Sequence, residues 1–143
     1  MIIILKFLDS SVFLYAYLKP SRKLKSVEKE TKEKAKKIIT RVEEGEEVVL
    51  TVVHLNEILS IIEARLGRQK CFGFLSHLLQ LENIHIVGVE EGDYEEALSI
   101  SSRYDVSISD ALAYVKMMYF DINEIYTFNE NFKKLPNIKV IQE

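Results

Sequence analysis

Short runs of apolar residues alternate along this chain with longer segments that carry an apolar stripe at helical spacing. Most of the runs are continuously apolar, which is typical of parallel strands covered by helices on both faces. We expect strands at Ile2–Leu8, Val48–Thr51, Ile84–Val89, Glu124–Thr127 and Ile138–Ile141. Strands that alternate with helices predict an α/β fold, with a mostly parallel sheet of about five strands joined by right-handed crossovers.

The segments between these runs are expected to be helical. Helices are predicted at Ser11–Leu18 and Ser26–Glu44, along the stripe Leu55–Leu66 that Gly67 ends, and around Phe72–Leu79. Two further helix starts are predicted from the capping-box spacing, in which a cap residue is followed three residues later by an acidic residue. The pairs are Asp93 with Glu96 and Ser107 with Asp110.

The length of 143 residues fits one domain, residues 1–143. Cys71 is the only cysteine, so no internal disulfide can form, which suits a reducing compartment. The apolar start of the chain is too short to span a membrane and is interrupted by Lys6, and no small-residue cleavage site follows it. The sequence therefore predicts a cytoplasmic protein with no membrane partner.

Charge is unevenly distributed along the chain. The formal net charge is −3, but Lys19–Arg41 holds ten Lys or Arg against three Glu, so this stretch carries +7 and the rest −10. The stretch could follow a nucleic-acid backbone through phosphate contacts, or it could be a solubilising helix face. The net charge therefore does not exclude an anionic substrate.

Three carboxylates stand at similar positions relative to the expected strands. Asp9 directly follows the first apolar run, Glu57 lies six residues past Thr51, and Asp110 opens an apolar helix. Ligands of parallel sheets gather at the carboxyl ends of the strands, and clustered like charges need a cation. We therefore predict a Mg²⁺ or Mn²⁺ site. The alternative is local: Asp9 and Asp110 as helix caps, and Glu57 as a solvated acid near a helix start.

Four segments resemble, in order and spacing, the motifs of PIN-domain ribonucleases. They are FLDSSVFLYAY, TVVHLNEIL, SISDALAYVKM and TFNENF, and together they cover essentially the whole chain. The resemblance extends to the VapC toxins, a large group of small PIN proteins. It implies a three-layer α/β/α sandwich and a divalent-metal-dependent endoribonuclease that leaves a 5′-phosphate and a 3′-hydroxyl.

The resemblance also implies roles for individual residues. Asp9, Glu57 and Asp110 match the acids that hold the metal and act in catalysis. Beside these acids, the hydroxyls of Ser11 and Thr127 are expected to hydrogen-bond the carboxylates or the scissile phosphate.

The fourth motif departs from the family, which often has Asp where this chain has Asn129. An amide oxygen can ligate a metal or position a water, but it adds no negative charge. Asn129 is therefore expected at the catalytic site, and the sequence leaves open whether this site binds one metal ion or two. His54, His77 and His85 lack metal-ligand spacing and receive no catalytic role.

The resemblance implies an RNA substrate, and for a toxin a cognate antitoxin protein and often a homodimer. Phe13, Tyr15 and Tyr17 could stack bases, or could pack in the core or at an interface.

Other functions compete with a toxin nuclease. A phosphoaspartate enzyme would also place Asp after its first strand, but the haloacid-dehalogenase type needs a second Asp where Ser11 stands, and the acidic pair and late Lys of a receiver domain are not evident. A PIN nuclease of RNA processing and a catalytically silent PIN-like module that binds RNA or protein stay open, the latter because of Asn129.

Overall fold

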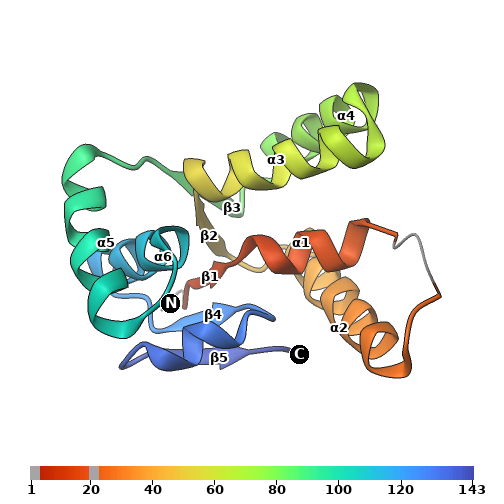
Figure 1. The fold of residues 1–143 in the computed structure, drawn as a ribbon. Coiled ribbons are helices and arrows are strands. Elements are labelled where there is room, and N and C mark those ends of the chain that lie inside the picture. Colours follow the sequence, from red (N-terminus) through yellow and green to blue (C-terminus); the bar gives the residue numbers. More distant parts are fainter. Residues whose placement is uncertain (1–3, 20–22) are drawn as a thin grey trace.

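The computed structural model describes residues 4–19 and 23–143, and its centre is a five-stranded parallel sheet (Figure 1). The strands are β1 (Lys6–Leu8), β2 (Val48–Thr51), β3 (Ile84–Val87), β4 (Glu124–Tyr126) and β5 (Lys139–Ile141), in the spatial order β3-β2-β1-β4-β5. All four neighbouring pairs are parallel. This confirms the predicted α/β class.

Helices cover both faces of the sheet, which confirms the three-layer sandwich (Figure 1). They are α1 (Ser10–Tyr17), α2 (Ser26–Glu43), α3 (Val52–Leu66), α4 (Arg68–Gln80), α5 (Glu91–Tyr104) and α6 (Ile108–Tyr119), with a short 3-10 helix η1 (Glu130–Lys134). Side chains of a strand alternate between two cores. Leu8 packs with α1–α4, whereas its neighbour Phe7 packs with α5 and α6.

The strand order places a topological switch point between β1 and β4. From β1 the chain moves outward to β2 and β3, and β4 then returns to the other side of β1. Phe7 accordingly pairs with Val49 on one side and with Ile125 on the other. Crevices at such switch points, beyond the carboxyl ends of the strands, are where open α/β sheets bind ligands.

The element boundaries follow the sequence closely. The strand at Val48–Thr51 is confirmed at both ends. The first strand was expected from Ile2, but residues 1–3 lie outside the described part, and the described strand begins at Lys6. The third strand ends at Val87 and not at Val89.

The expected cap of α5 is wrong by three residues. Glu90 is the N-cap, and Asp93 is the third helical residue, whose carboxylate accepts a hydrogen bond from the Glu90 backbone N–H at 2.8 Å. The Asp93 carboxylate also forms a salt bridge with Lys116 of α6 at 2.8 Å. Asp93 thus stabilises the start of α5 from within the first turn of that helix. The other capping box begins as expected, because the Ser107 hydroxyl accepts from the Asp110 N–H at 3.0 Å.

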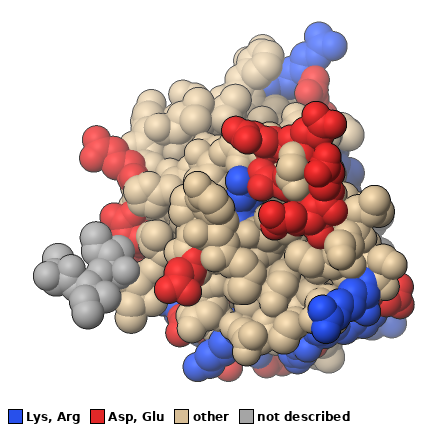
Figure 2. All heavy atoms as spheres, turned by 90° about the vertical axis from the view of Figure 1, so that its left-hand side faces the viewer, with Lys and Arg blue, Asp and Glu red and all other residues tan. Residues whose placement is uncertain are grey.

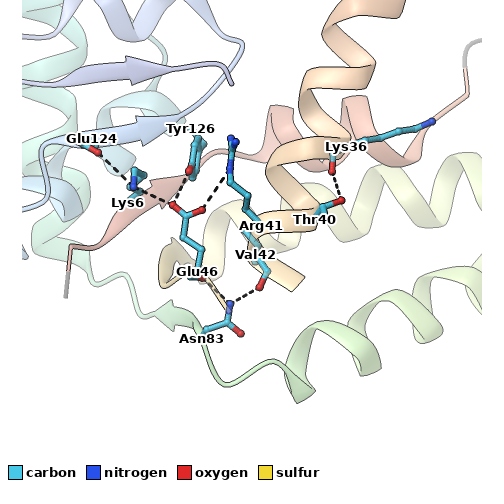
Figure 3. Close-up of polar contacts among 9 residues, drawn as sticks. All are labelled: Lys6, Lys36, Thr40, Arg41, Val42, Glu46, Asn83, Glu124 and Tyr126. Atoms are coloured by element: carbon cyan, nitrogen blue, oxygen red, sulfur yellow. Dashed lines mark hydrogen bonds and ion pairs between the residues drawn. The ribbon is translucent and has the colours of Figure 1, made fainter. Parts of the chain in front are cut away.

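A polar network ties strands together at the opposite, amino edge of the sheet (Figure 3). The Glu46 carboxylate accepts from the Tyr126 hydroxyl at 2.6 Å and pairs with Lys6 at 3.0 Å. The Asn83 amide donates to the carbonyls of Val42 and Glu46, each at 2.7 Å. Burial first, and then the bond to Glu46, raises the pKa of Tyr126 to about 12.

Surface charge is segregated as the sequence suggests. Acidic side chains gather on the face that carries α5 (Figure 2), and the segment 90–96 alone supplies Glu90, Glu91, Asp93, Glu95 and Glu96. None of the described helices is both long and apolar enough to cross a membrane.

Candidate active site

Asp9 lies at the switch point, directly after β1, and is 4% exposed. It is the N-cap of α1: its carboxylate accepts from the Ser11 N–H at 3.3 Å and from the Thr127 hydroxyl at 2.8 Å. The capping role considered from the sequence is therefore real, but it occupies only one of the two carboxylate oxygens, Oδ2. No hydrogen bond to Oδ1 is found among the described residues.

Ser11 and Thr127 join the start of α1 to the segment after β4. Their hydroxyl oxygens are 3.4 Å apart, and the Ser11 hydroxyl accepts from the Phe128 N–H at 3.0 Å. The fully buried Thr127 hydroxyl also accepts from the Asn129 N–H at 3.0 Å. These bonds fix Asp9 relative to the fourth motif.

Asp110 enters the same region from the first turn of α6. The residue is 8% exposed, and its carboxylate accepts from the Asn129 side-chain amide at 3.0 Å. Burial raises the pKa of Asp110, and the negative charge of Asp9 raises it further, while the bonds from Asn129 and Ser107 act in the opposite direction. The structure therefore brings Asp9, Asp110 and Asn129 into one interacting set.

Glu57 lies on α3 beside this set. It accepts a hydrogen bond from the hydroxyl of Ser109, the residue before Asp110, at 2.5 Å. Within residues 4–19 and 23–143, no three His, Cys, Asp or Glu side chains are grouped closely enough to hold one metal ion. A metal set that includes Glu57 therefore stays a prediction.

A divalent cation fits the chemistry of the site. Asp9 and Asp110 are buried and raise each other's energy when both are charged. No salt bridge is found for either carboxylate across the described part of the chain. Carboxylate oxygens that lack a neutralising partner are the ligands that Mg²⁺ and Mn²⁺ prefer.

His54 is a contributor that the sequence did not identify. It is 1% exposed, its Nδ1 lies 2.6 Å from the Thr51 hydroxyl, and its Nε2 lies 3.0 Å from the Ser109 carbonyl. A carbonyl only accepts, so Nε2 carries the hydrogen. The Thr51 oxygen already accepts two backbone N–H bonds, so its hydroxyl donates to Nδ1. The ring thereby joins β2 and α3 to the turn that carries Asp110.

The comparison with family models now has a structural context. The model described as PIN domain matches residues 6–138. The chain belongs to the PIN-domain family. Membership supports a nuclease, and it agrees with the resemblance that the four motifs indicated. No curated protein sequence matches the chain.

Solved structures share this PIN fold at low sequence identity. VapC20 of Mycobacterium tuberculosis, described as a sarcin-ricin loop cleaving toxin, superposes with a TM-score of 0.73 at 18% identity, covering 96% of this chain and 98% of the other. VapBC2 of Rickettsia felis, bound to a promoter DNA fragment, gives 0.66 at 12%, with the same coverage. A toxin–antitoxin complex of Klebsiella pneumoniae gives 0.63 at 13%, covering 95% of each chain. At these identities the likeness concerns the fold.

Proposed function

We propose that this PIN domain is a divalent-metal-dependent endoribonuclease that hydrolyses RNA phosphodiester bonds, and that it is the toxin of a VapBC-type toxin–antitoxin pair. The observation that carries the proposal is the pairing of two buried carboxylates, Asp9 and Asp110, at the switch point of the sheet. A cation would relieve their electrostatic repulsion, and a divalent cation can activate a water and neutralise charge on a phosphodiester.

Asp9 and Asp110 would hold Mg²⁺ or Mn²⁺, and Glu57 would ligate the ion or hold one of its waters. When bound, the ion lowers the pKa of a water and neutralises charge on the phosphate oxygens. The protein's own residues orient these groups: Thr127 and Ser11 fix Asp9, and the Asn129 amide holds one oxygen of Asp110.

The expected products are a 5′-phosphate and a 3′-hydroxyl. Attack by a water on the phosphorus, with departure of the 3′-oxygen, gives these ends and needs no ribose 2′-hydroxyl. An end analysis of the cleaved RNA with a phosphatase-sensitive label checks this assignment.

The partners follow from the same proposal. Two of the similar folds were solved as toxin–antitoxin or VapBC assemblies, which supports a cognate antitoxin for this chain. Exposed apolar side chains of α3 and α4, namely Leu66, Phe72 and Leu79, support a homodimer. The buried, unpaired thiol of Cys71 is compatible with a cytoplasmic location.

One observation favours a second candidate, a catalytically silent module. Asn129 contributes no charge to the site. Among the described residues only two carboxylates, those of Asp9 and Asp110, interact there, and no group of three acids could hold a metal ion. A housekeeping PIN nuclease differs from a toxin only in target and partner. A neighbouring gene for a small DNA-binding protein distinguishes these two.

The proposal is tested by incubating the full chain with single-stranded RNA. We expect cleavage that EDTA stops and that added Mg²⁺ or Mn²⁺ restores. Asp9→Asn should abolish cleavage, because it removes a ligand charge, whereas Glu95→Gln, the same change at an exposed position on α5, should leave the rate unchanged. Full activity in chelator would refute the metal mechanism, and metal binding without cleavage of any RNA would support the silent module.

A further inference from the structure

The three aromatic residues of α1 have different surroundings. Phe13 is 2% exposed and packs against Phe74 at 5.7 Å between ring centroids. Tyr17 packs against the same Phe74 at 5.4 Å. Tyr15 belongs to neither contact and is 44% exposed. The core interpretation therefore holds for Phe13. Tyr17 is also exposed, at 38%, but its ring packs against Phe74, whereas Tyr15 lies outside this aromatic cluster.

Tyr15 is connected to the candidate active site through Phe128. The two rings meet edge to face, with centroids 5.7 Å apart and planes at 70°. Phe128 stands between Thr127 and Asn129, and its N–H is held by the Ser11 hydroxyl. Tyr15 lies one helical turn after Ser11, so its Cα is about 6 Å further along the axis of α1. The Tyr15–Phe128 pair thus lies beside the candidate active site and is not part of its carboxylate set.

A hollow of about 280 Å³ opens beside this pair. It is lined by Tyr15, Phe128, Val27, Glu30, Thr31, Lys34, Glu130 and Gln142. A second hollow of about 360 Å³ shares Lys34 and Gln142 with the first, and it adds Lys133 and Lys139. The two hollows are therefore neighbours, and we call the surface that they cover, from the fourth motif to this group of lysines, the path.

We propose that the hollow beside Tyr15 and Phe128 holds an unpaired RNA base next to the scissile phosphate, and that the strand continues over Lys34, Lys133 and Lys139. The inference rests on the proposed function, and it specifies where on the protein the RNA substrate binds. Stacking on an aromatic ring suits single-stranded RNA because every base has a flat face.

The charges along the path divide it into two parts. Glu30 and Glu130 in the first hollow would repel a phosphate, but they tolerate a neutral base and can accept from its amino groups. Lys34, which lines both hollows, pairs with Glu30 at 3.5 Å, and Lys133 pairs with Glu130 at 2.6 Å. Lys139 has no ion-pair partner in the described part of the chain, and three lysines outnumber the one acid, Glu143, in the second hollow. Phosphates are therefore expected at the lysine end of the path.

The base subsite is tested by fluorescence anisotropy with a labelled single-stranded oligoribonucleotide in EDTA, where no cleavage competes. Tyr15→Leu should weaken binding about tenfold, as the loss of one stacked base does, and Tyr15→Phe should bind as the wild type does. Tyr119→Leu, which removes a 74% exposed ring from α6, is the matched control and should have no effect.

A second measurement does not depend on the variants. An oligoribonucleotide that contains 4-thiouridine is cross-linked to the wild-type chain by light, and the cross-linked peptide is identified by mass spectrometry. We expect the peptides that contain Tyr15 or Phe128. Cross-links confined to other segments, or equal affinity of Tyr15→Leu and wild type, would overturn the subsite.

The lysine part is tested through salt dependence. Lys139→Gln should lower the slope of log affinity against log salt by about 0.7, the value for one phosphate contact of a single strand. Lys70→Gln, on exposed α4, should leave the slope unchanged. An unchanged slope for Lys139→Gln would show that Lys139 contacts no phosphate, and would refute the lysine part of the proposal.

These outcomes separate the subsite from the nuclease. RNA cleavage with no effect of Tyr15→Leu leaves the nuclease and refutes the subsite. Tyr15-dependent RNA binding with no cleavage under any metal supports the subsite and refutes the nuclease. Failure of the wild type to bind or cross-link RNA at all refutes the subsite directly.

Discussion

Asp110 is held between opposing influences at the residue scale. Burial and the charge of Asp9 raise the pKa of its carboxyl group, while the amide of Asn129 and the hydroxyl of Ser107 stabilise the charged form. Because the pKa in the folded state is raised, the charged group destabilises the fold, and this contribution grows as pH rises through that pKa. The charged form of Asp110 is therefore a local cost to the stability of the fold.

Asp110→Asn should relieve this conflict. We expect the melting temperature in EDTA at neutral pH to rise by about 2–5 °C, because the charge is removed while an amide can still bond to Asn129. Metal affinity, measured by calorimetry with Mn²⁺, should fall at least tenfold. At a pH well below the carboxyl pKa, the wild type and the variant should melt together. A lower melting temperature for the variant at neutral pH would show that Asp110 is not in conflict with Asp9.

Substitutions of Asn129 give a second residue-scale prediction. Asn129→Asp replaces the donor to Asp110 by a like charge, so the melting temperature in EDTA should fall and metal affinity should rise, most clearly at low salt. Asn129→Ala should reduce cleavage and leave metal affinity largely intact. Calorimetry and melting on both variants separate the effects. Unchanged affinity and stoichiometry in Asn129→Asp would place residue 129 out of reach of the metal.

The sequence could predict the acids of the site but not all of their supports. Asp9 and Asp110 were recognisable because strand ends and helix starts are visible as changes in hydrophobic pattern. His54 and Ser109 sit within helical segments, and each acts through a partner on another element. A pattern read along a single element has no signal for such a contact. The cap of α5 was missed because segment 90–96 contains several acids suited to capping.

At the scale of elements, α3 and α6 are coupled by two hydrogen bonds that both end at Ser109. His54 donates to the Ser109 carbonyl, and the Ser109 hydroxyl donates to Glu57, one turn further along α3. The first turn of α6 is thus fixed to α3, and Asp110 is the next residue. The coupling sets where Asp110 faces Asp9.

His54→Leu should disturb this coupling. It leaves the Ser109 carbonyl and the Thr51 hydroxyl without their partner, so we expect a loss of about 1–3 kcal/mol in the free energy of unfolding and a clear loss of Mn²⁺ affinity. His54→Gln can place an amide N–H near the position of Nε2 and should restore much of the Mn²⁺ affinity. Equal affinity of the two variants would mean that His54 only fills space.

The elements themselves were predictable because buried parallel strands leave continuous apolar runs. All five strands lie where such runs occur, and β2 matches at both ends. The order of strands was not predictable in this way, since nothing in an apolar run states which neighbour it pairs with. That β4 returns beside β1, and so creates the switch point, emerges only from the three-dimensional structure.

At the scale of the whole molecule, the amino edge of the sheet stabilises the fold at a distance from the chemistry. Glu46 there receives the Tyr126 hydroxyl and the Lys6 ammonium (Figure 3). Arg41 also lies over the Tyr126 ring, 5.5 Å from its centroid. This edge connects β1, β4 and the end of α2, whereas the opposite edge carries the carboxylates.

This network gives a pH prediction. The pKa of Tyr126 is raised from 10.0 to about 12, so the protonated phenol stabilises the fold fully below pH 10 and the contribution is lost as pH rises toward 12. Chemical denaturation at several alkaline pH values should show a steeper loss of stability for wild type than for Tyr126→Phe, with a difference of up to about 3 kcal/mol. If the free energy of unfolding falls equally with pH in the wild type and in Tyr126→Phe, the fold does not raise the pKa of Tyr126.

The return of β4 to the side of β1 has a consequence for synthesis of the chain. Asp9 leaves the ribosome early, but Thr127, which binds it, is 118 positions later, and Asn129 follows. At roughly 5–20 residues per second this separation takes about 6–24 s. A nascent chain that has made β1 to β3 holds three of the five strands but lacks both Asp110 and the segment that orients Asp9. A translating ribosome therefore completes nearly all of this protein before the proposed catalytic group can assemble.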